Sequence, residues 1–345
     1  MSNDNTKKPP IDTVYLLGAG FSYNALPVVN DWPAAMKNFK IILIKYLKSN
    51  KEENVNNLIL RIVLEKSLKF QTPDTFAKIL KITKDENLKY LKFLIDLFIS
   101  SCHCSKLILQ DNRPHTSFKT FGDFLQQQRV YNKENLNQYS VDGWVLDSRI
   151  ISFASEIHDQ FSRFSFLNWN YDLQLEKSLN LVTDRKDLTD MSSENIYHIN
   201  GKIDVKKISQ IIKNYNQTPI EPPFKNCFIN IESKIRYAFE QPLSSAPLQE
   251  TQISALEQSK NLVIIGYSFP YYNNEVDSFI LKHFIGDQIK AEKGKKKKIY
   301  IQDQVPLVIE ERLSLYHEEI FNTLSKDKRI IPIKDTTRFF VPPAS

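Results

Sequence analysis

A glycine-containing turn is the first feature of this sequence that suits chemistry. It follows a short apolar run near the N-terminus, and its two glycines let backbone N–H groups approach a pyrophosphate closely. A serine two positions further on can donate to the same group or cap the next helix. A tyrosine at position 23 leaves the G-x-G-x-x-G pattern incomplete, so a tight strand-to-loop turn is an equal alternative. The turn consists of Gly18, Ala19, Gly20, Phe21 and Ser22.

Five short runs rich in β-branched and aromatic residues predict the strands that position this turn. Helical periodicity separates them, so strands and helices alternate. This alternation predicts an α/β fold: a Rossmann-like, doubly wound parallel sheet with helices on both faces. Ligands of such sheets bind outside the C-terminal ends of the strands, where the turn falls. The predicted strands are 13–17, 164–167, 196–200, 261–265 and 298–303.

Helical patterns occupy much of the remaining sequence. We expect a single domain over 1–345, with a helical insertion at 35–145 because this stretch has few strand signals. The segment 205–245 has Pro219, Pro222 and Pro223 and is expected to be irregular. The predicted helices are 34–48, 55–69, 73–99, 147–161, 249–259 and 305–324.

Composition narrows the class of protein. Only 8 of the 345 residues are glycine, where ordinary usage predicts roughly two dozen, so collagen-like and glycine-rich low-complexity classes are excluded. A net charge of +6 arises from 46 basic and 40 acidic residues that are interleaved, so the charge does not indicate direct nucleic-acid binding, and we do not expect it. We expect a cytoplasmic protein with no signal peptide, no membrane helix, no disulfide framework and no metal site.

Three motifs together resemble the sirtuin-like family, in particular the bacterial sirtuin-like NAD-consuming domains of antiphage defence systems. The first is 17–22 with Pro27 after it, the second is 169–172 with Glu176, and the third is 265–270 with Asp277. Their order and spacing, and the ending 336–339, are also similar to that family. The resemblance covers roughly 12–341, and a more distant likeness is to abortive-infection proteins. It implies that NAD is the substrate and that the bond between nicotinamide and ribose is broken.

The resemblance places the catalytic asparagine at Asn170. An amide can both donate to and accept from a ribose hydroxyl or a water molecule, which suits an oxocarbenium-like transition state. Asp172 would be a second polar contact or an orienting group. The alternative for both residues is a capping pair at a strand-to-helix turn.

The expected general base is where the sequence departs from the family. The family's histidine precedes the glycine that corresponds to Gly201, but Asn200 occupies this position. His198 would lie on the same side of an extended strand as Asn200, displaced by about 6–7 Å. An imidazole can act as a base near neutral pH and an amide cannot. Either His198 substitutes as the base, Asn200 only positions water, or catalysis is weak; a half-buried strand histidine is the structural alternative.

Further residues are expected to contact the dinucleotide at the strand ends. Gly266 and Ser268 would face it, and the ring of Phe269 or Tyr267 could pack on a base or a ribose. Asp303 could bind an adenosine ribose hydroxyl. A turn stiffened by a proline is the alternative for the third motif. The expected NAD-binding residues are Gly18, Ala19, Gly20, Phe21, Ser22, Pro27, Gly201, Gly266, Tyr267, Ser268 and Asp303.

These expectations converge on a cytoplasmic NAD+ glycohydrolase that acts as a toxic effector against phage. The three cysteines cannot build the four-cysteine zinc module of deacetylating sirtuins, so hydrolysis is favoured over deacetylation. Activity that harms the host must be gated, so we expect a separate ATPase, Argonaute-like or nucleotide-processing partner and a homo- or hetero-oligomer. The alternative is a pseudoenzyme that binds NAD or ADP-ribose as a regulatory subunit, which Asn200 favours.

Overall fold

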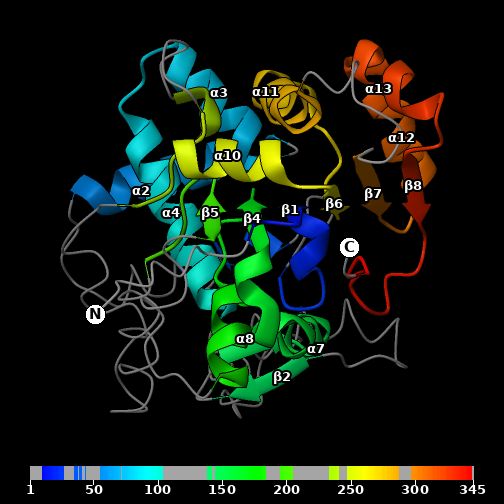
Figure 1. Cartoon of the computed structure of the whole chain (residues 1–345). Coiled ribbons are helices and arrows are strands. Elements are labelled where there is room, and N and C mark those ends of the chain that lie inside the picture. Colours follow the sequence, from blue (N-terminus) through cyan, green and yellow to red (C-terminus); the bar gives the residue numbers. More distant parts are fainter. Residues whose placement is uncertain are drawn as a thin grey trace, which may run out of the picture.

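A six-stranded sheet forms the centre of the protein in a computed structural model (Figure 1). All of its strand pairs are parallel, and helices cover both faces, so the predicted Rossmann-like α/β fold is confirmed. The structure describes residues 10–26, 35–37, 39, 40, 43, 55–70, 72–103, 138–141, 144–183, 195–204, 233–240, 247–286 and 297–343.

The strand order identifies where a ligand would bind. The spatial order is β5-β4-β1-β6-β7-β8, which is the 3-2-1-4-5-6 order of dinucleotide-binding sheets when only these strands are numbered. The chain therefore reverses its direction of winding between β1 and β6, which is the switch point of the fold. The strands are β1 Thr13–Leu17, β4 Phe164–Asn168, β5 Ile196–His198, β6 Asn261–Ile265, β7 Lys298–Gln302 and β8 Ile330–Ile333.

Alternating side chains of each strand enter two separate cores. In β1, Val14 and Leu16 face one core, whereas Tyr15 and Leu17 face the other. Every residue of β1 is buried, because the strand is central and helices cover both of its faces. The first core contains residues of α10 Glu250–Gln258, α11 Asn274–Ile285, α12 Pro306–Tyr316 and α13 Glu318–Ser325; the second contains residues of α7 Ser148–Ile157 and α8 Gln174–Val182.

The strands end at the same level, which brings distant parts of the sequence together. Leu17 of β1 is paired with Asn168 of β4 on one side and with Ile265 of β6 on the other. Ile265 is in turn paired with Gln302 of β7. The residues that follow each strand therefore emerge side by side at one edge of the sheet.

The turns after β1 and β6 touch each other through their backbones. A Cβ atom on Gly18 would lie 2.5 Å from the carbonyl oxygen of Gly266, and one on Gly20 would lie 2.7 Å from the Cα of Gly266. A Cβ on Gly266 would lie 2.4 Å from the Cα of Gly20. Gly266 also has a φ of +59°, which disfavours residues with a side chain. These glycines are therefore needed for the close approach of two strand-end turns.

Most of the described residues within 35–145 are helical, apart from turns and the strands β2 Gln138–Val141 and β3 Trp144–Asp147 at the end of this stretch. They form α2 Val55–Ser67, α3 Pro73–Ile82 and α4 Asn87–Cys102, with further helical residues at 35–37, 39, 40 and 43. Their apolar side chains make a third core, which includes Leu173 and Ile203 from the sheet domain. None of the described helices combines the length and the apolar composition needed to cross a membrane.

Two predicted helices are each divided in the structure. The predicted helix 73–99 breaks after Thr83, where Lys84 adopts a left-handed φ of 53° and the Asp85 side chain accepts from the Asn87 N–H at 2.8 Å. The predicted helix 305–324 breaks at His317, between α12 and α13. Neither break carries a glycine or proline, so the apolar periodicity runs through both without a stop signal.

Several elements of the structure are absent from the predicted set. They are α8, α11, β8, and the hairpin of β2 with β3 Trp144–Asp147. Helix α11 had a readable signature, because acidic residues occupy its first turn and Gly286 follows its last residue. The predicted strand 196–200 is shorter than expected and ends at His198.

We expect Gly266→Ala to destabilise the protein by on the order of 3–5 kcal/mol, since its Cβ would overlap the backbone of Gly20 in addition to straining φ. Gly286→Ala is the matched control. It also has a positive φ, but the nearest atom to its Cβ is 4.0 Å away, so only the strain of about 1–2 kcal/mol applies. Urea denaturation of both variants measures the difference, and equal losses would contradict the backbone contact.

Candidate functional site

A cavity of about 740 Å³ opens at the carboxyl edge of the sheet, where β1 and β6 end. Its walls are the turns after β1, β4, β6 and β7, parts of α3 and α4, and the C-terminal segment. This is the location expected for a ligand of a doubly wound sheet. The predicted site residues that line it are Gly18, Ala19, Gly20, Ser22, Asn170, Asp172, Asn200, Gly266, Tyr267, Ser268 and Asp303.

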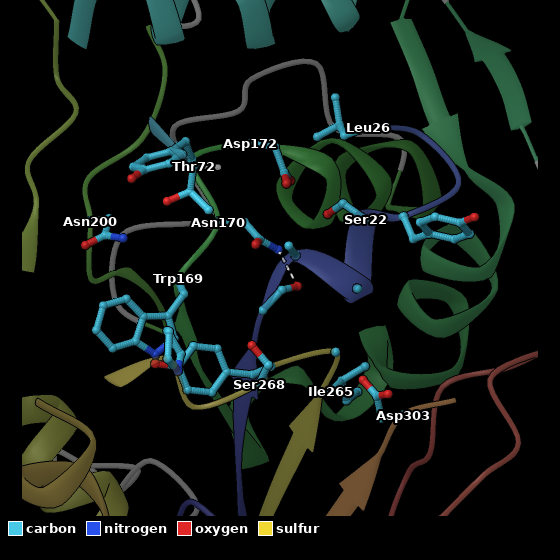
Figure 2. A pocket seen from close by; sticks show the side chains of 18 of the residues that line it. Ser22, Leu26, Thr72, Trp169, Asn170, Asp172, Asn200, Ile265, Ser268 and Asp303 are labelled. Carbon is cyan, nitrogen blue, oxygen red and sulfur yellow. Dashed lines mark hydrogen bonds between the residues drawn. The ribbon is translucent and has the colours of Figure 1, made fainter. Parts of the chain in front are cut away.

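Asn170 lies near the middle of the labelled side chains of the cavity (Figure 2). Its backbone N–H donates to Asn168 Oδ1 at 3.0 Å, and its Nδ2 donates to the Gly18 carbonyl at 2.9 Å. A carbonyl oxygen only accepts, so this contact fixes which end of the amide is the nitrogen. Oδ1 has no hydrogen-bond partner among the residues that the structure describes. Asn170 therefore offers the cavity an acceptor, whereas the sequence suggested both a donor and an acceptor.

Asp172 is a buried carboxyl group in the wall of the cavity, with 4% of its surface exposed. Its Oδ1 accepts from the Gln174 N–H at 3.0 Å, which is the capping contact proposed as the structural alternative. Burial raises the pKa of Asp172 to about 6, although the hydrogen bond from the Gln174 backbone and the nearby Ser22 hydroxyl lower it. A carboxyl group with such a pKa can exchange a proton near neutral pH, so the capping and chemical roles are compatible.

His198 does not line the cavity, contrary to the role expected for it. Its Nδ1 lies 2.9 Å from the Asn170 carbonyl oxygen, and its Nε2 lies 2.7 Å from Glu176 Oε1. The side chains of His198 and Glu176 are 5% and 2% exposed. With both ring nitrogens engaged inside the protein, the imidazole is not placed to take a proton from a molecule in the cavity.

Asn200 lines the cavity, but not in the geometry that an extended strand would give. The strand ends at His198, and the backbone turns before Asn200, whose carbonyl accepts from the Arg236 N–H at 2.7 Å. Gly201 lies outside the cavity lining, at an isolated bridge to Ile235. Its predicted contact with NAD is therefore not supported, and close approach of the 234–236 backbone accounts for the glycine.

The turn after β1 holds the side chain of Asn170, but two of its backbone N–H groups are not free to donate to a phosphate. The Gly20 N–H donates to the Gly266 carbonyl at 3.0 Å, and the Gly18 N–H donates to the Ile265 carbonyl at 2.9 Å. Two of the amides expected to approach a pyrophosphate are thus already engaged. Phe21 is absent from the cavity lining, and the centroid of its ring lies 4.6 Å from that of Phe339. Pro27 is outside the described residues.

A stacked aromatic pair closes one side of the cavity. Trp169 and Tyr267 have ring centroids 5.5 Å apart and nearly parallel planes. The Tyr267 hydroxyl contacts both carboxyl oxygens of Asp277 at 2.9 Å and accepts from Asn273 Nδ2 at 2.9 Å. Burial raises the pKa of Asp277 well above its ordinary value, so this network is held without an opposite charge. Phe269, the other ring considered for stacking on a ligand, is packed in the core.

The insertion contributes an acidic residue that the sequence analysis missed. Asp74 lines the cavity from the first turn of α3, where Thr72 caps the helix. Its Oδ1 accepts from the Tyr171 hydroxyl at 2.8 Å, and Tyr272 also hydrogen bonds to it. Burial raises the pKa of Asp74 above its ordinary value. The Thr72 cap and Pro73 predict that a helix begins here, but nothing in the neighbouring sequence predicts that this helix packs against the cavity.

Arg149 is a second residue that the sequence did not indicate. Its guanidinium group contacts Asp147 through Nη2 at 2.6 Å and donates from Nη1 to the Thr336 carbonyl at 3.0 Å. It also lies 4.9 Å from the ring of Phe339. Asp147 is fully buried and also accepts from the Asn24 N–H, in the turn after β1. The ion pair therefore links this turn, through Asp147, to the C-terminal segment, which Arg149 contacts.

Asp303 and Arg312 line the cavity on the side of β7 and α12, which we call the opposite rim because it lies across the cavity from Asp172 and Asn200 (Figure 2). Asp303 follows β7 directly, and its Oδ1 accepts from the Val305 N–H at 3.0 Å. Arg312 extends from α12 and donates to the Ser268 carbonyl at 3.0 Å. Within the described part of the chain, no group of three histidine, cysteine or carboxylate side chains is arranged to hold a metal ion.

The fold and the cavity define a Rossmann-like α/β protein with a ligand-sized cavity at its switch point. No protein-family model matches the chain, and no curated protein sequence matches it. Functional inference therefore depends on the geometry of the cavity.

We expect Asp172→Asn to change stability in a pH-dependent way. The pKa rises from 3.8 to about 6 on folding, so the folded state favours the protonated form, and wild type loses stability as pH rises from about 4 to 6. Asparagine stays neutral, so the variant should gain roughly 1–3 kcal/mol relative to wild type between pH 4 and pH 8. Urea denaturation at both pH values measures this, with Asp303→Asn as the control. A gain that is independent of pH would contradict the assignment.

Proposed function

We propose that the protein hydrolyses NAD+ to nicotinamide and ADP-ribose in this cavity. The observation that carries the proposal is the pairing of Asn170, fixed with its Oδ1 unengaged by described residues, with the buried carboxyl group of Asp172 in the same cavity wall. Both stand at the switch point of a sheet whose strand order is that of dinucleotide-binding folds. The resemblance of the sequence to sirtuin-like NAD-consuming domains points to the same substrate.

The reaction needs a water molecule as nucleophile and an acceptor for its proton. Water attacks the ribose carbon that bears nicotinamide, the carbon–nitrogen bond breaks, and its electron pair leaves with nicotinamide. Asn170 Oδ1 would accept a hydrogen bond from the water or from a ribose hydroxyl, which orients the reacting groups. Since no histidine lines the cavity among the described residues, we assign the proton to Asp172, whose pKa of about 6 leaves it mainly ionised at neutral pH.

The aromatic side of the cavity suits the end of NAD+ that carries nicotinamide. The nicotinamide ring of NAD+ is a cation until the bond breaks and is neutral afterwards. Trp169, Tyr267 and Tyr171 contribute aromatic side chains to the lining, and Asp74 and Asp172 contribute carboxyl groups. Aromatic faces and carboxylates attract a cationic ring more strongly than a neutral one, so this side favours binding of the substrate and release of nicotinamide.

Depletion of NAD+ would harm the cell that makes the protein, so the activity has to be controlled. We propose a sirtuin-like effector of antiphage defence in the bacterial cytoplasm that is activated by a separate protein. An ATPase, an Argonaute-like protein or a nucleotide-processing enzyme could provide the signal, through hetero-oligomeric assembly.

A regulatory pseudoenzyme that binds NAD or ADP-ribose is the second candidate. Two observations favour it: Asn200 stands where the family has a histidine, and His198 lies outside the cavity lining. The two candidates differ in one measurable outcome, because a pseudoenzyme binds NAD+ and releases no nicotinamide.

Asn170→Ala and Asp172→Asn should each lower the rate of nicotinamide release by about 100-fold or more, since one removes the orienting acceptor and the other removes the base. The measurement is free nicotinamide during incubation of the full chain with NAD+. Asp303→Asn is the matched control at the opposite rim; it should raise KM and leave kcat within about threefold. If both variants release nicotinamide as fast as wild type, the site is wrongly assigned.

A further inference from the structure

We propose that His198 is a positioning residue that fixes the backbone of Asn170, and that Glu176 in turn fixes His198. The inference rests on the proposed function, because it assigns a role in preparing Asn170 for the reaction. The sequence suggested that His198 is the general base. In this proposal His198 instead acts through Asn170, whose backbone it holds.

The hydrogen-bond partners of His198 determine where its protons are. The Asn170 carbonyl can only accept, so the Nδ1 atom at 2.9 Å must carry a proton. Nε2 lies 2.7 Å from Glu176 Oε1, which Lys202 Nζ approaches at 3.5 Å. Although burial opposes ionisation, His198 and Lys202 lower the pKa of Glu176. Both ring nitrogens thus face protein groups, and His198 is absent from the cavity lining, so the ring is not placed to take a proton from a water molecule in the cavity.

The same contacts show what His198 does for Asn170. The backbone N–H of Asn170 is held by Asn168, its Nδ2 by the Gly18 carbonyl, and its carbonyl oxygen by His198. Each contact comes from a different strand end, since Asn168 ends β4, Gly18 follows β1, and His198 ends β5. Three polar groups of Asn170 are therefore fixed, and Oδ1 is the fourth. Loss of the His198 contact would free the peptide group that follows Asn170 and let Oδ1 move away from its productive position.

Two substitutions separate the two hydrogen bonds of the ring. In His198→Asn, the side-chain amide nitrogen occupies roughly the position of Nδ1 and can still donate to the Asn170 carbonyl. In His198→Gln, the amide nitrogen reaches roughly the position of Nε2 and can still donate to Glu176. Each variant keeps one contact and loses the other, and neither has an imidazole.

The proposal predicts that the variant with the higher kcat is the one with the lower Tm. His198→Asn should keep kcat within about threefold of wild type, and His198→Gln should lower it at least tenfold with little change in KM. Thermal unfolding should show the reverse, with the larger fall in Tm in His198→Asn, because that variant leaves the buried Glu176 without its closest partner. An equal and severe loss of kcat in both variants would establish a general base and overturn the proposal. Loss of kcat that follows the order of Tm would show a merely structural role and would also overturn it.

Amide hydrogen exchange supplies a readout that does not require turnover. In the full chain without NAD+, exchange over residues 169–173 should be faster in His198→Gln than in His198→Asn, because only the former releases the Asn170 carbonyl. Equal exchange rates would overturn the proposal whatever the activity. If exchange differs as expected but wild type releases no nicotinamide, the positioning role holds and the proposed hydrolysis fails.

Discussion

The backbone contact between the turns after β1 and β6 is the constraint on which the rest of the site depends. Gly18, Gly20 and Gly266 bring these two turns to a separation that leaves no room for a Cβ atom. The contact places the Gly18 carbonyl where it accepts from Asn170 and leaves Tyr267 free to stack on Trp169 across the end of β1. These three glycines therefore shape one wall of the cavity, and their effect on a ligand acts through the side chains that they allow to meet.

Buried carboxyl groups around the cavity are stabilised in different ways, and the difference assigns their roles. Asp147 is paired with Arg149, and Glu176 with His198, so both are structural anions with defined partners. Asp277 has a hydroxyl donor in place of a cation, and burial raises its pKa well above the ordinary value. Asp172 is intermediate: it accepts from the Gln174 N–H and forms no salt bridge with a described residue, and its pKa of about 6 is the one suited to exchange of a proton near neutrality.

The sequence predicted the sheet well because periodicity and strand ends are local properties. The predicted runs 13–17 and 261–265 are β1 and β6 without change, and Asn170 and Asp172 lie where a strand-end site requires them. The role of His198 could not be predicted in the same way, because it depends on where β5 ends. The strand ends at His198, before the predicted end at residue 200, and Gly201 then forms an antiparallel bridge with Ile235. Asp74 was missed for a related reason: its position above the cavity is set by packing of the insertion against residues such as Leu173 and Ile203, far away in the sequence.

The same dependence on distant contacts also explains how the Asn170 acceptor keeps its orientation in the cavity wall. An amide side chain that can rotate would not hold its oxygen in one direction, so the orientation of Asn170 Oδ1 has to be fixed by the contacts of its other polar groups. The Gly18 carbonyl prevents that rotation because it accepts only from the nitrogen end of the amide. Asn168 and His198 hold the two flanking peptide groups, so the backbone cannot turn to relieve the oxygen either. The orientation of Oδ1 is thus maintained by contacts from three strands, and a ligand that donates a hydrogen bond at this point would meet an acceptor that needs no rearrangement.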